Sequence, residues 1–172
     1  MNSLLHSIYQ RRSVRAFDRG VPSEDRILDL LEAAMAAPSA CARDPWHFVV
    51  VTDRDMLLRM AEGLPNGKFL TQAGAGIVVC GSLAEAHDGQ LSYLLQDCAA
   101  AIENLLLAAP ALGLGACWLG VHPREDRVRH LRSLLKIPPE VLPVAVLAVG
   151  NPAEHKPART RYQAAKVHTN AW

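Results

Sequence analysis

The sequence has little of what marks several specialised classes of protein. Its formal net charge is only +1, aromatic residues make up 5% of its 172 residues, and its seven histidines are scattered. A charge this close to zero argues against general binding to nucleic acid or to an acidic membrane surface. No histidine or cysteine spacing matches a metal-ligand motif, so we expect no metal site.

Cysteine is also scarce, with four residues and no C-x-x-C pair. Cys80, Cys98 and Cys117 lie in apolar surroundings, and we interpret them as buried free thiols rather than disulfides or zinc ligands. The first ten residues have neither the basic nor the apolar region of a signal peptide. Both observations favour a reducing cytoplasm.

No apolar run is long enough to predict a membrane span. The longest, over residues 105–121, has 17 residues without a charge, whereas a spanning helix needs about 20. Pro110, Gly113 and Gly115 interrupt this run, which predicts a helix end, a turn and a strand. We therefore expect no membrane partner.

Apolar residues, in contrast, are abundant. They make up 50% of the chain, against 20% for charged residues, which is enough to build a sizeable core. The length suits one domain over residues 1–172, and no shift in composition divides it.

Hydrophobic periodicity predicts helices and strands that follow one another along the chain. Ile27, Leu30, Leu31 and Ala34 recur at helical spacing, whereas the run Phe48–Val51 is short and rich in β-branched residues. The same criteria predict helices over 4–11, 24–37, 53–62, 90–109 and 124–135, and strands over 48–51, 77–80, 115–119 and 144–149. We expect an α+β fold of two or three layers, with a mixed sheet flanked by helices.

Two segments suggest that the fold is completed by a second subunit. The helix over 90–109 is apolar almost all round, so it forms either the core of the domain or a subunit interface. The tail over 151–172 has no core periodicity and ends in a tryptophan. We predict that this tail extends over the partner subunit of a homodimer.

Two basic clusters could bind an anion. Arg11, Arg12, Ser13 and Arg15 combine guanidinium groups with a hydroxyl, a combination that suits a phosphate dianion. The alternative is a solvated run of charge at a helix end. In the tail, Arg159 and Arg161 would face the same side of an extended segment, although a mobile basic tail is the simpler interpretation.

Two further segments have the small residues that allow close backbone approach. The loop over 38–46 could approach a flat ligand, or it could be an ordinary connection from helix to strand. The segment Gly113–Gly120 contains G-x-G before a strand, which is the reverse of the order in dinucleotide-binding folds. Neither segment is diagnostic by itself.

The order of these segments along the chain resembles the FMN-dependent nitroreductase family. The resemblance covers nearly the whole chain and lies in RRSVRAFD, APSACARDPWHFVVV, LLQDCAAAIENLLLAAPALGLGACWLG and LLKIPPEVLPVAVLAVGNPAE. It implies an FMN-binding α+β sandwich whose two subunits exchange terminal segments, with two FMN sites at the subunit interface.

The resemblance also implies a set of cofactor-binding residues. In such proteins the opening cluster binds the FMN phosphate and ribityl chain, a basic residue lies near N1 and O2 of the flavin, and a small-residue loop comes from the other subunit. Backbone near N5, a basic tail and a lysine near the pyrimidine end complete the site. Transferred to this sequence, these are Arg11, Arg12, Ser13, Arg15, Pro38, Ser39, Ala40, Lys68, Leu119, Gly120, Arg159 and Arg161.

The function implied by the resemblance is an NAD(P)H-dependent oxidoreductase that reduces nitro compounds, quinones or a related acceptor in a ping-pong scheme. The family loop usually reads N-x-Q-P-W, and here Ala42 and Asp44 replace its two amides. Three alternatives stay open: a specialised FMN dehydrogenase or dehalogenase, a flavin-binding or redox-sensing protein with low turnover, and a helical interaction module without a cofactor.

Overall fold

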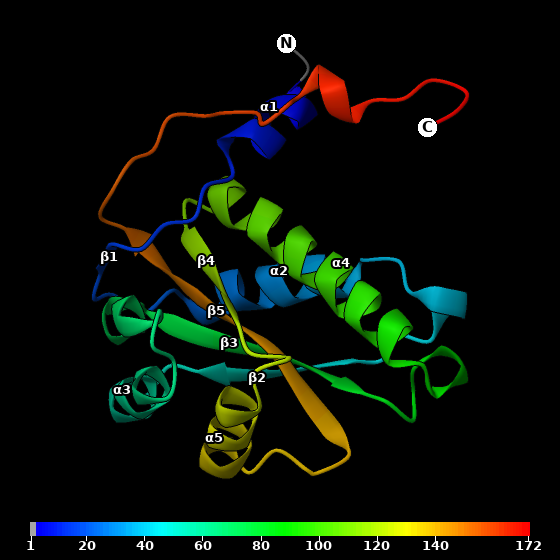
Figure 1. Cartoon of the computed structure of the whole chain (residues 1–172). Helices are drawn as coiled ribbons and strands as arrows, with labels where there is room; N and C mark the ends of the chain where they lie inside the picture. The colour runs from blue at the N-terminus through cyan, green and yellow to red at the C-terminus, as the bar shows by residue number, and fades with distance from the viewer. Residues whose placement is uncertain (1–2) are drawn as a thin grey trace.

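The computed structural model describes residues 3–172, which form a three-layer sandwich followed by an extended tail (Figure 1). The helices are α1 (Ser3–Gln10), α2 (Glu24–Met35), α3 (Arg54–Glu62), α4 (Leu91–Ala111) and α5 (Glu125–Leu135), with short 3-10 turns η1 (Ala40–Ala42), η2 (Lys68–Gln72), η3 (His87–Gly89) and η4 (Ala164–Lys166). The strands are β1 (Phe17–Asp18), β2 (Trp46–Val51), β3 (Ala75–Ser82), β4 (Gly115–Gly120) and β5 (Val141–Pro152). The predicted α+β class is confirmed.

The sheet is built around the long strand β5, which pairs with β3 on one side and β4 on the other. Strand β2 extends the sheet beyond β3, and the short β1 pairs with the end of β5. All four pairings of named strands are antiparallel, which corrects the expectation of a mixed sheet. The physical reason is that α3 and η2 return the chain to the end of the sheet that it left, so that Val51 lies opposite Gly76.

Alternate residues of each central strand face opposite layers. Ile77 and Val79 pack against α2 and α4, whereas Val78 and Cys80 pack against α3 and α5. This explains why the central strands are apolar without alternation, since both faces of the sheet are covered.

Helix α4 packs one side against the sheet and α2. Leu94, Cys98, Ile102 and Leu105 are fully buried in this core. Five further apolar residues of the helix are only partly buried within one chain, namely Leu95, Ala99, Ala100, Leu107 and Ala108. Of these, Leu95, Ala100 and Ala108 still pack against this core. No helix of the described residues is long and apolar enough to cross a membrane.

The predicted thiols are confirmed. Cys80, Cys98 and Cys117 are buried and unpaired, and Cys41 is an exposed free thiol. Burial raises the pKa of Cys80 and of Cys98 to about 12, and it also raises the pKa of Cys117.

Candidate functional site

The segment between α1 and β1 is extended and lies against β4. Val14 donates its backbone N–H to the carbonyl of Ala116 at 3.0 Å, and Ser13 forms a parallel bridge with the same residue. A Cβ at Gly115 would lie 2.8 Å from a methyl group of Val14, so the glycine permits this close approach. The second glycine of G-L-G thus serves backbone packing.

The extended backbone determines which side of the segment each side chain of the opening cluster faces. Successive residues of an extended segment point to opposite sides. Arg11, Ser13 and Arg15 line one pocket of about 430 Å³, while Val14 lines a different pocket on the other side and Arg12 borders both. Three of the residues that the family resemblance assigns to FMN, Arg11, Ser13 and Arg15, therefore face the same space.

This space, which we call the cationic pocket, lies between α1, the middle of α4 and the tail. Its further lining comes from two residues of α1, one acid of α4 and four residues of the tail: Ile8, Tyr9, Glu103, Lys156, Arg159, Thr160 and Arg161. The pocket joins the two basic clusters that lie far apart in the sequence. Its volume falls within the range of small-molecule sites.

Backbone hydrogen bonds bring the tail to this pocket. Ala153 donates its N–H to Ala16 at 2.9 Å, directly after β5 pairs with β1, and Arg159 donates its N–H to the carbonyl of Tyr9 at 3.1 Å. The guanidinium of Arg12 donates to the carbonyl of Pro157. Residues 151–159 therefore contact their own chain before the tail continues along α1 (Figure 1).

Two tail residues that the sequence analysis missed fix the opening cluster. The carboxylate of Glu154 accepts from the backbone N–H of Arg15 at 2.5 Å and of Ala16 at 3.3 Å. The ammonium of Lys156 donates to the same carboxylate at 2.8 Å and to the carbonyl of Ser13 at 2.7 Å. Their spacing of two residues in an extended segment was the available signal.

These contacts determine the charge state of the clip that Glu154 and Lys156 form. The hydrogen bond from Lys156, followed by the backbone N–H of Arg15, lowers the pKa of Glu154 below its ordinary value. Glu154 is thus ionised over the neutral range and neutralises Lys156 rather than the arginines.

The guanidinium groups of the pocket are poorly compensated. Arg11 pairs with Glu103, with 3.3 Å between Nε and Oε1. Among the described residues, Arg12, Arg15, Arg159 and Arg161 have no carboxylate partner within ion-pair distance. The charges of Arg12 and Arg161 lower the pKa of Arg159, which is the sign of a cluster that repels itself. Such a cluster suits a dianion.

The residues expected near the flavin ring lie beyond Arg15. The Arg15 guanidinium sits 5.8 Å from the centre of the Phe69 ring, next to the exposed Lys68 at the start of η2. A Cβ at Gly67 would lie 3.2 Å from Leu119, which connects η2 with β4. Gly120, at the end of β4, has open space where a Cβ would stand.

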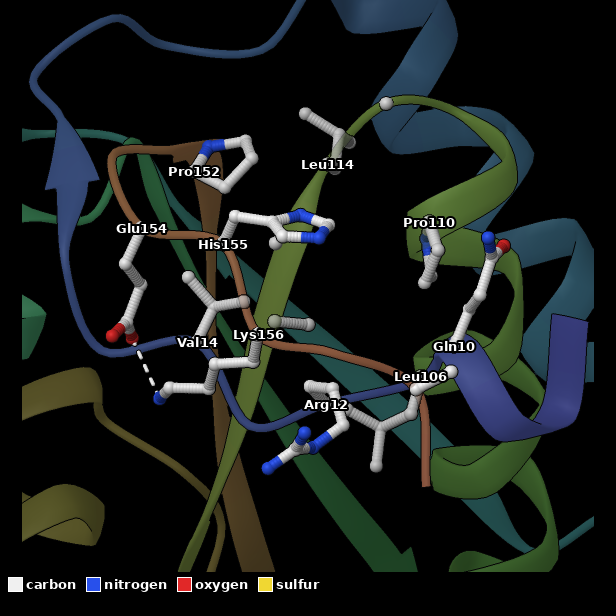
Figure 2. A pocket seen from close by; sticks show the side chains of 14 residues that line it. Gln10, Arg12, Val14, Leu106, Pro110, Leu114, Pro152, Glu154, His155 and Lys156 are labelled. Atoms are coloured by element: carbon white, nitrogen blue, oxygen red, sulfur yellow. Dashed lines mark hydrogen bonds and ion pairs between the residues drawn. The ribbon is translucent and has the colours of Figure 1, made fainter. Parts of the chain in front are cut away.

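A smaller pocket of about 310 Å³ lies on the other side of the opening segment (Figure 2). Gln10, Arg12 and Leu106 border one side of it, and Pro152 and Glu154 border the other. Its walls mix apolar residues of α4 and β4 with the Glu154–Lys156 pair. No site residue expected from the sequence lines it except Arg12.

The structure does not bring the loop over 38–44 to the cationic pocket of its own chain. This loop lies beside the N-terminal half of α4, whereas α1 and the tail lie near the other end of the helix (Figure 1). Ala40 donates its N–H to Asp97 of α4 at 2.9 Å. Pro38, Ser39 and Ala40 therefore do not line the cationic pocket of their own chain.

Internal contacts hold the loop in an uncommon conformation. Cys41, Ala42 and Asp44 have φ values of 52°, 51° and 49°, a region that costs other residues than glycine about 1–3 kcal/mol each. Ser39 donates its hydroxyl to the Asp44 carboxylate at 2.5 Å and accepts the Asp44 backbone N–H at 3.0 Å. The acid at the usual glutamine position thus binds within its own loop.

The chain is similar to known proteins over most of its length. The family model described as "Nitroreductase family" matches residues 8–65 and 58–151. A protein of Archaeoglobus fulgidus, provisionally named an NADH dehydrogenase/NAD(P)H nitroreductase, is 44% identical over 178 residues and is covered in full, as is this chain.

Solved structures give the same result. A crystal structure from Parabacteroides distasonis, with the same provisional name, has a TM-score of 0.94 at 39% identity and full coverage of both chains. A nitroreductase from Desulfovibrio desulfuricans, provisionally named and in complex with FMN, has a TM-score of 0.85 at 29% identity, over 100% of this chain and 99% of that chain. The chain belongs to the nitroreductase family.

Proposed function

We propose that the protein is an FMN-dependent oxidoreductase that uses NAD(P)H to reduce a nitro compound, a quinone or a related acceptor. The observation that carries the proposal is the cationic pocket, where guanidinium groups without carboxylate partners meet the hydroxyl of Ser13. A flavin phosphate carries about −1.5 to −2 charges at neutral pH, and it would compensate this excess.

Each group of residues has a separate part in this proposal. Ser13, Arg159 and Arg161 hold the phosphate together with Arg11, while Arg12 keeps the tail in place through Pro157. Arg15 and Lys68 place positive charge near the pyrimidine edge of the ring, which favours the anionic reduced form. When bound, FMN supplies the hydride chemistry, so the chain needs no acid–base dyad of its own.

We propose a homodimer in which the loop over 38–40 and the tail beyond Arg161 reach the partner. The apolar residues of α4 that are only partly buried support this, as do the exposed side chains of Met35, Tyr162 and Trp172. Apolar surface of this kind is buried in stable dimers. The two flavin sites would then share the interface, and donor and acceptor would use one pocket in turn.

We place the reaction in a reducing cytoplasm, because all four cysteines are free thiols. We expect no nucleic-acid or membrane partner, because the chain has a formal net charge of only +1.

The test is an absorbance spectrum of the purified protein after addition of FMN and desalting, followed by anaerobic NADH or NADPH. We expect flavin absorbance that survives desalting and bleaches with at least one donor. Retained flavin that neither donor bleaches would favour a flavin-binding or sensing protein. Loss of all flavin on desalting would contradict the cofactor assignment.

A further inference from the structure

Asp97 is a buried acid in the N-terminal half of α4. Its side chain is 5% exposed, and its neighbours Leu94, Cys98 and Ala101 belong to the core. Burial of a carboxyl group in apolar surroundings destabilises a fold unless hydrogen bonds compensate it. The presence of an acid at this position therefore needs a reason other than packing.

The contacts of Asp97 give that reason. Its Oδ1 atom accepts the backbone N–H of Ala40 at 2.9 Å, across a separation of 57 residues. Its Oδ2 atom is buried and has no hydrogen-bond partner among the described residues. The one contact that the acid makes is thus with the loop that carries Ser39 and Ala40.

This loop needs an anchor. Its left-handed residues Cys41, Ala42 and Asp44 are unfavourable in a free chain, and the Ser39–Asp44 hydrogen bonds close the loop only on itself. Arg43 reaches the carbonyl of Glu85 at a long 3.3 Å, from an exposed side chain. Cys41 also contacts Nε2 of His87, at 3.8 Å from its sulfur and on an exposed part of the surface. Among these contacts, the Asp97–Ala40 hydrogen bond is the one that ties the loop to a buried side chain of the core.

We infer that Asp97 is a positioning residue: it fixes the loop over 38–44 in the conformation that covers the flavin ring of the partner subunit. This inference rests on the proposed function. The role differs from that of Arg11 or Arg159, because Asp97 acts through the backbone of Ala40 and not on the phosphate.

The test compares Asp97→Leu with Asp97→Asn and with a matched control, Asn104→Leu. Asn retains an oxygen that can accept from Ala40, whereas Leu removes it. Asn104 is a partly buried polar residue of the same helix that donates to the carbonyl of Ala33 at 3.1 Å, away from the loop. All three variants change α4, but only Asp97→Leu releases Ala40.

Three measurements are made on each full-length variant: the dissociation constants for FMN and riboflavin, the thermal midpoint without flavin, and the rate of tryptic cleavage after Arg43. For Asp97→Leu we expect about tenfold weaker binding of both flavins, because the substitution removes one hydrogen bond between a carboxylate and the loop. Cleavage after Arg43 should become several times faster. The thermal midpoint should hold or rise, because a partly unpartnered buried acid is removed.

We expect Asp97→Asn to bind both flavins within about threefold of the wild type, and Asn104→Leu to leave both flavin binding and cleavage unchanged. Unchanged flavin affinity in Asp97→Leu would overturn the inference. It would also be overturned if Asn104→Leu weakened flavin binding equally, since the effect would then be general destabilisation. If the wild type bound no flavin, the proposed function would fail, and the cleavage rates would still decide whether Asp97 anchors the loop.

Discussion

Arg159 provides the sharpest test of the phosphate site. Its guanidinium is exposed in the cationic pocket and is repelled by Arg12, Arg161 and Arg11 when the pocket holds no anion. Replacement by glutamine removes this repulsion together with a charged donor. The substitution should therefore affect the free protein and the flavin complex in opposite directions.

The expected loss in the complex follows from the type of contact. Loss of one hydrogen bond from an exposed guanidinium to the phosphate corresponds to an affinity that is about ten- to hundredfold weaker. Arg159→Gln should weaken FMN binding by this factor. Riboflavin lacks the phosphate, so its affinity should stay unchanged, and the thermal midpoint of the flavin-free protein should not fall.

The assay is a titration of flavin fluorescence with FMN and with riboflavin at two salt concentrations. The wild type should lose more FMN affinity at high salt than the variant, because screening acts on the charge that the variant lacks. Arg59→Gln, an exposed arginine of α3 outside the pocket, is the matched control. Equal losses for FMN and riboflavin, or no loss for either, would refute the assignment of Arg159 to the phosphate.

Three further predictions concern other parts of the molecule. In the flavin-free native protein, a thiol reagent at pH 8 should modify only the exposed Cys41, and addition of FMN should slow this reaction. Modification of a second thiol would contradict the burial and the raised pKa values of Cys80, Cys98 and Cys117. Contacts with Lys156 and the backbone N–H of Arg15 lower the native pKa of Glu154, so its ionised form stabilises the fold above the ordinary pKa of a glutamate. Glu154→Gln should therefore lower the free energy of unfolding at pH 7 by about 1 kcal/mol or less, and this difference should decrease as the pH falls through the native pKa; a difference that does not decrease in urea titrations at progressively lower pH would argue against the clip. A mixed dimer of one Arg159→Gln chain and one Asp97→Leu chain should have one FMN site of wild-type affinity, because both substitutions affect the same site and leave the second site intact. Two weakened sites in the mixed dimer would show that the loop and the pocket of each site belong to one chain.

Much of the fold could be predicted from local patterns. The apolar residues of α4 predicted a helix over 90–109, and the helix runs from Leu91 to Ala111. The β-branched run at 48–51 marked β2, which begins two residues earlier at Trp46. Periodicity reports the burial of side chains on each element, so it finds the middle of an element more reliably than its ends.

The direction of the strands could not be predicted in the same way. Helices between strands suggested crossover connections, but α3 and η2 bring the chain back beside Val51. Whether a helix crosses the sheet or returns to the same end depends on tertiary packing, here on Leu57 and Met60 against Val78. No local pattern in the sequence contains that information.

The candidate site, like the fold, could be predicted only in part from local patterns in the sequence. The opening cluster and the basic tail were predicted as anion-binding candidates from residue type alone, and the structure joins them in one pocket. The separate role of Arg12 depends on the extended backbone against Ala116, a contact between distant segments. Asp97 was missed because its hydrogen-bond partner is a backbone N–H, which leaves no signature in a sequence. Glu154 and Lys156 were missed although their spacing was a signal, because their contacts to the backbone of residues 13–16 join segments far apart in the chain.

The most direct test of the account is a crystal structure of the protein with FMN. We predict a homodimer with the phosphate within hydrogen-bond distance of the Ser13 hydroxyl and the guanidinium groups of Arg11 and Arg159. Ala40 of the partner subunit should lie against the same flavin. A phosphate bound outside the cationic pocket, or a flavin enclosed by one chain alone, would contradict the account.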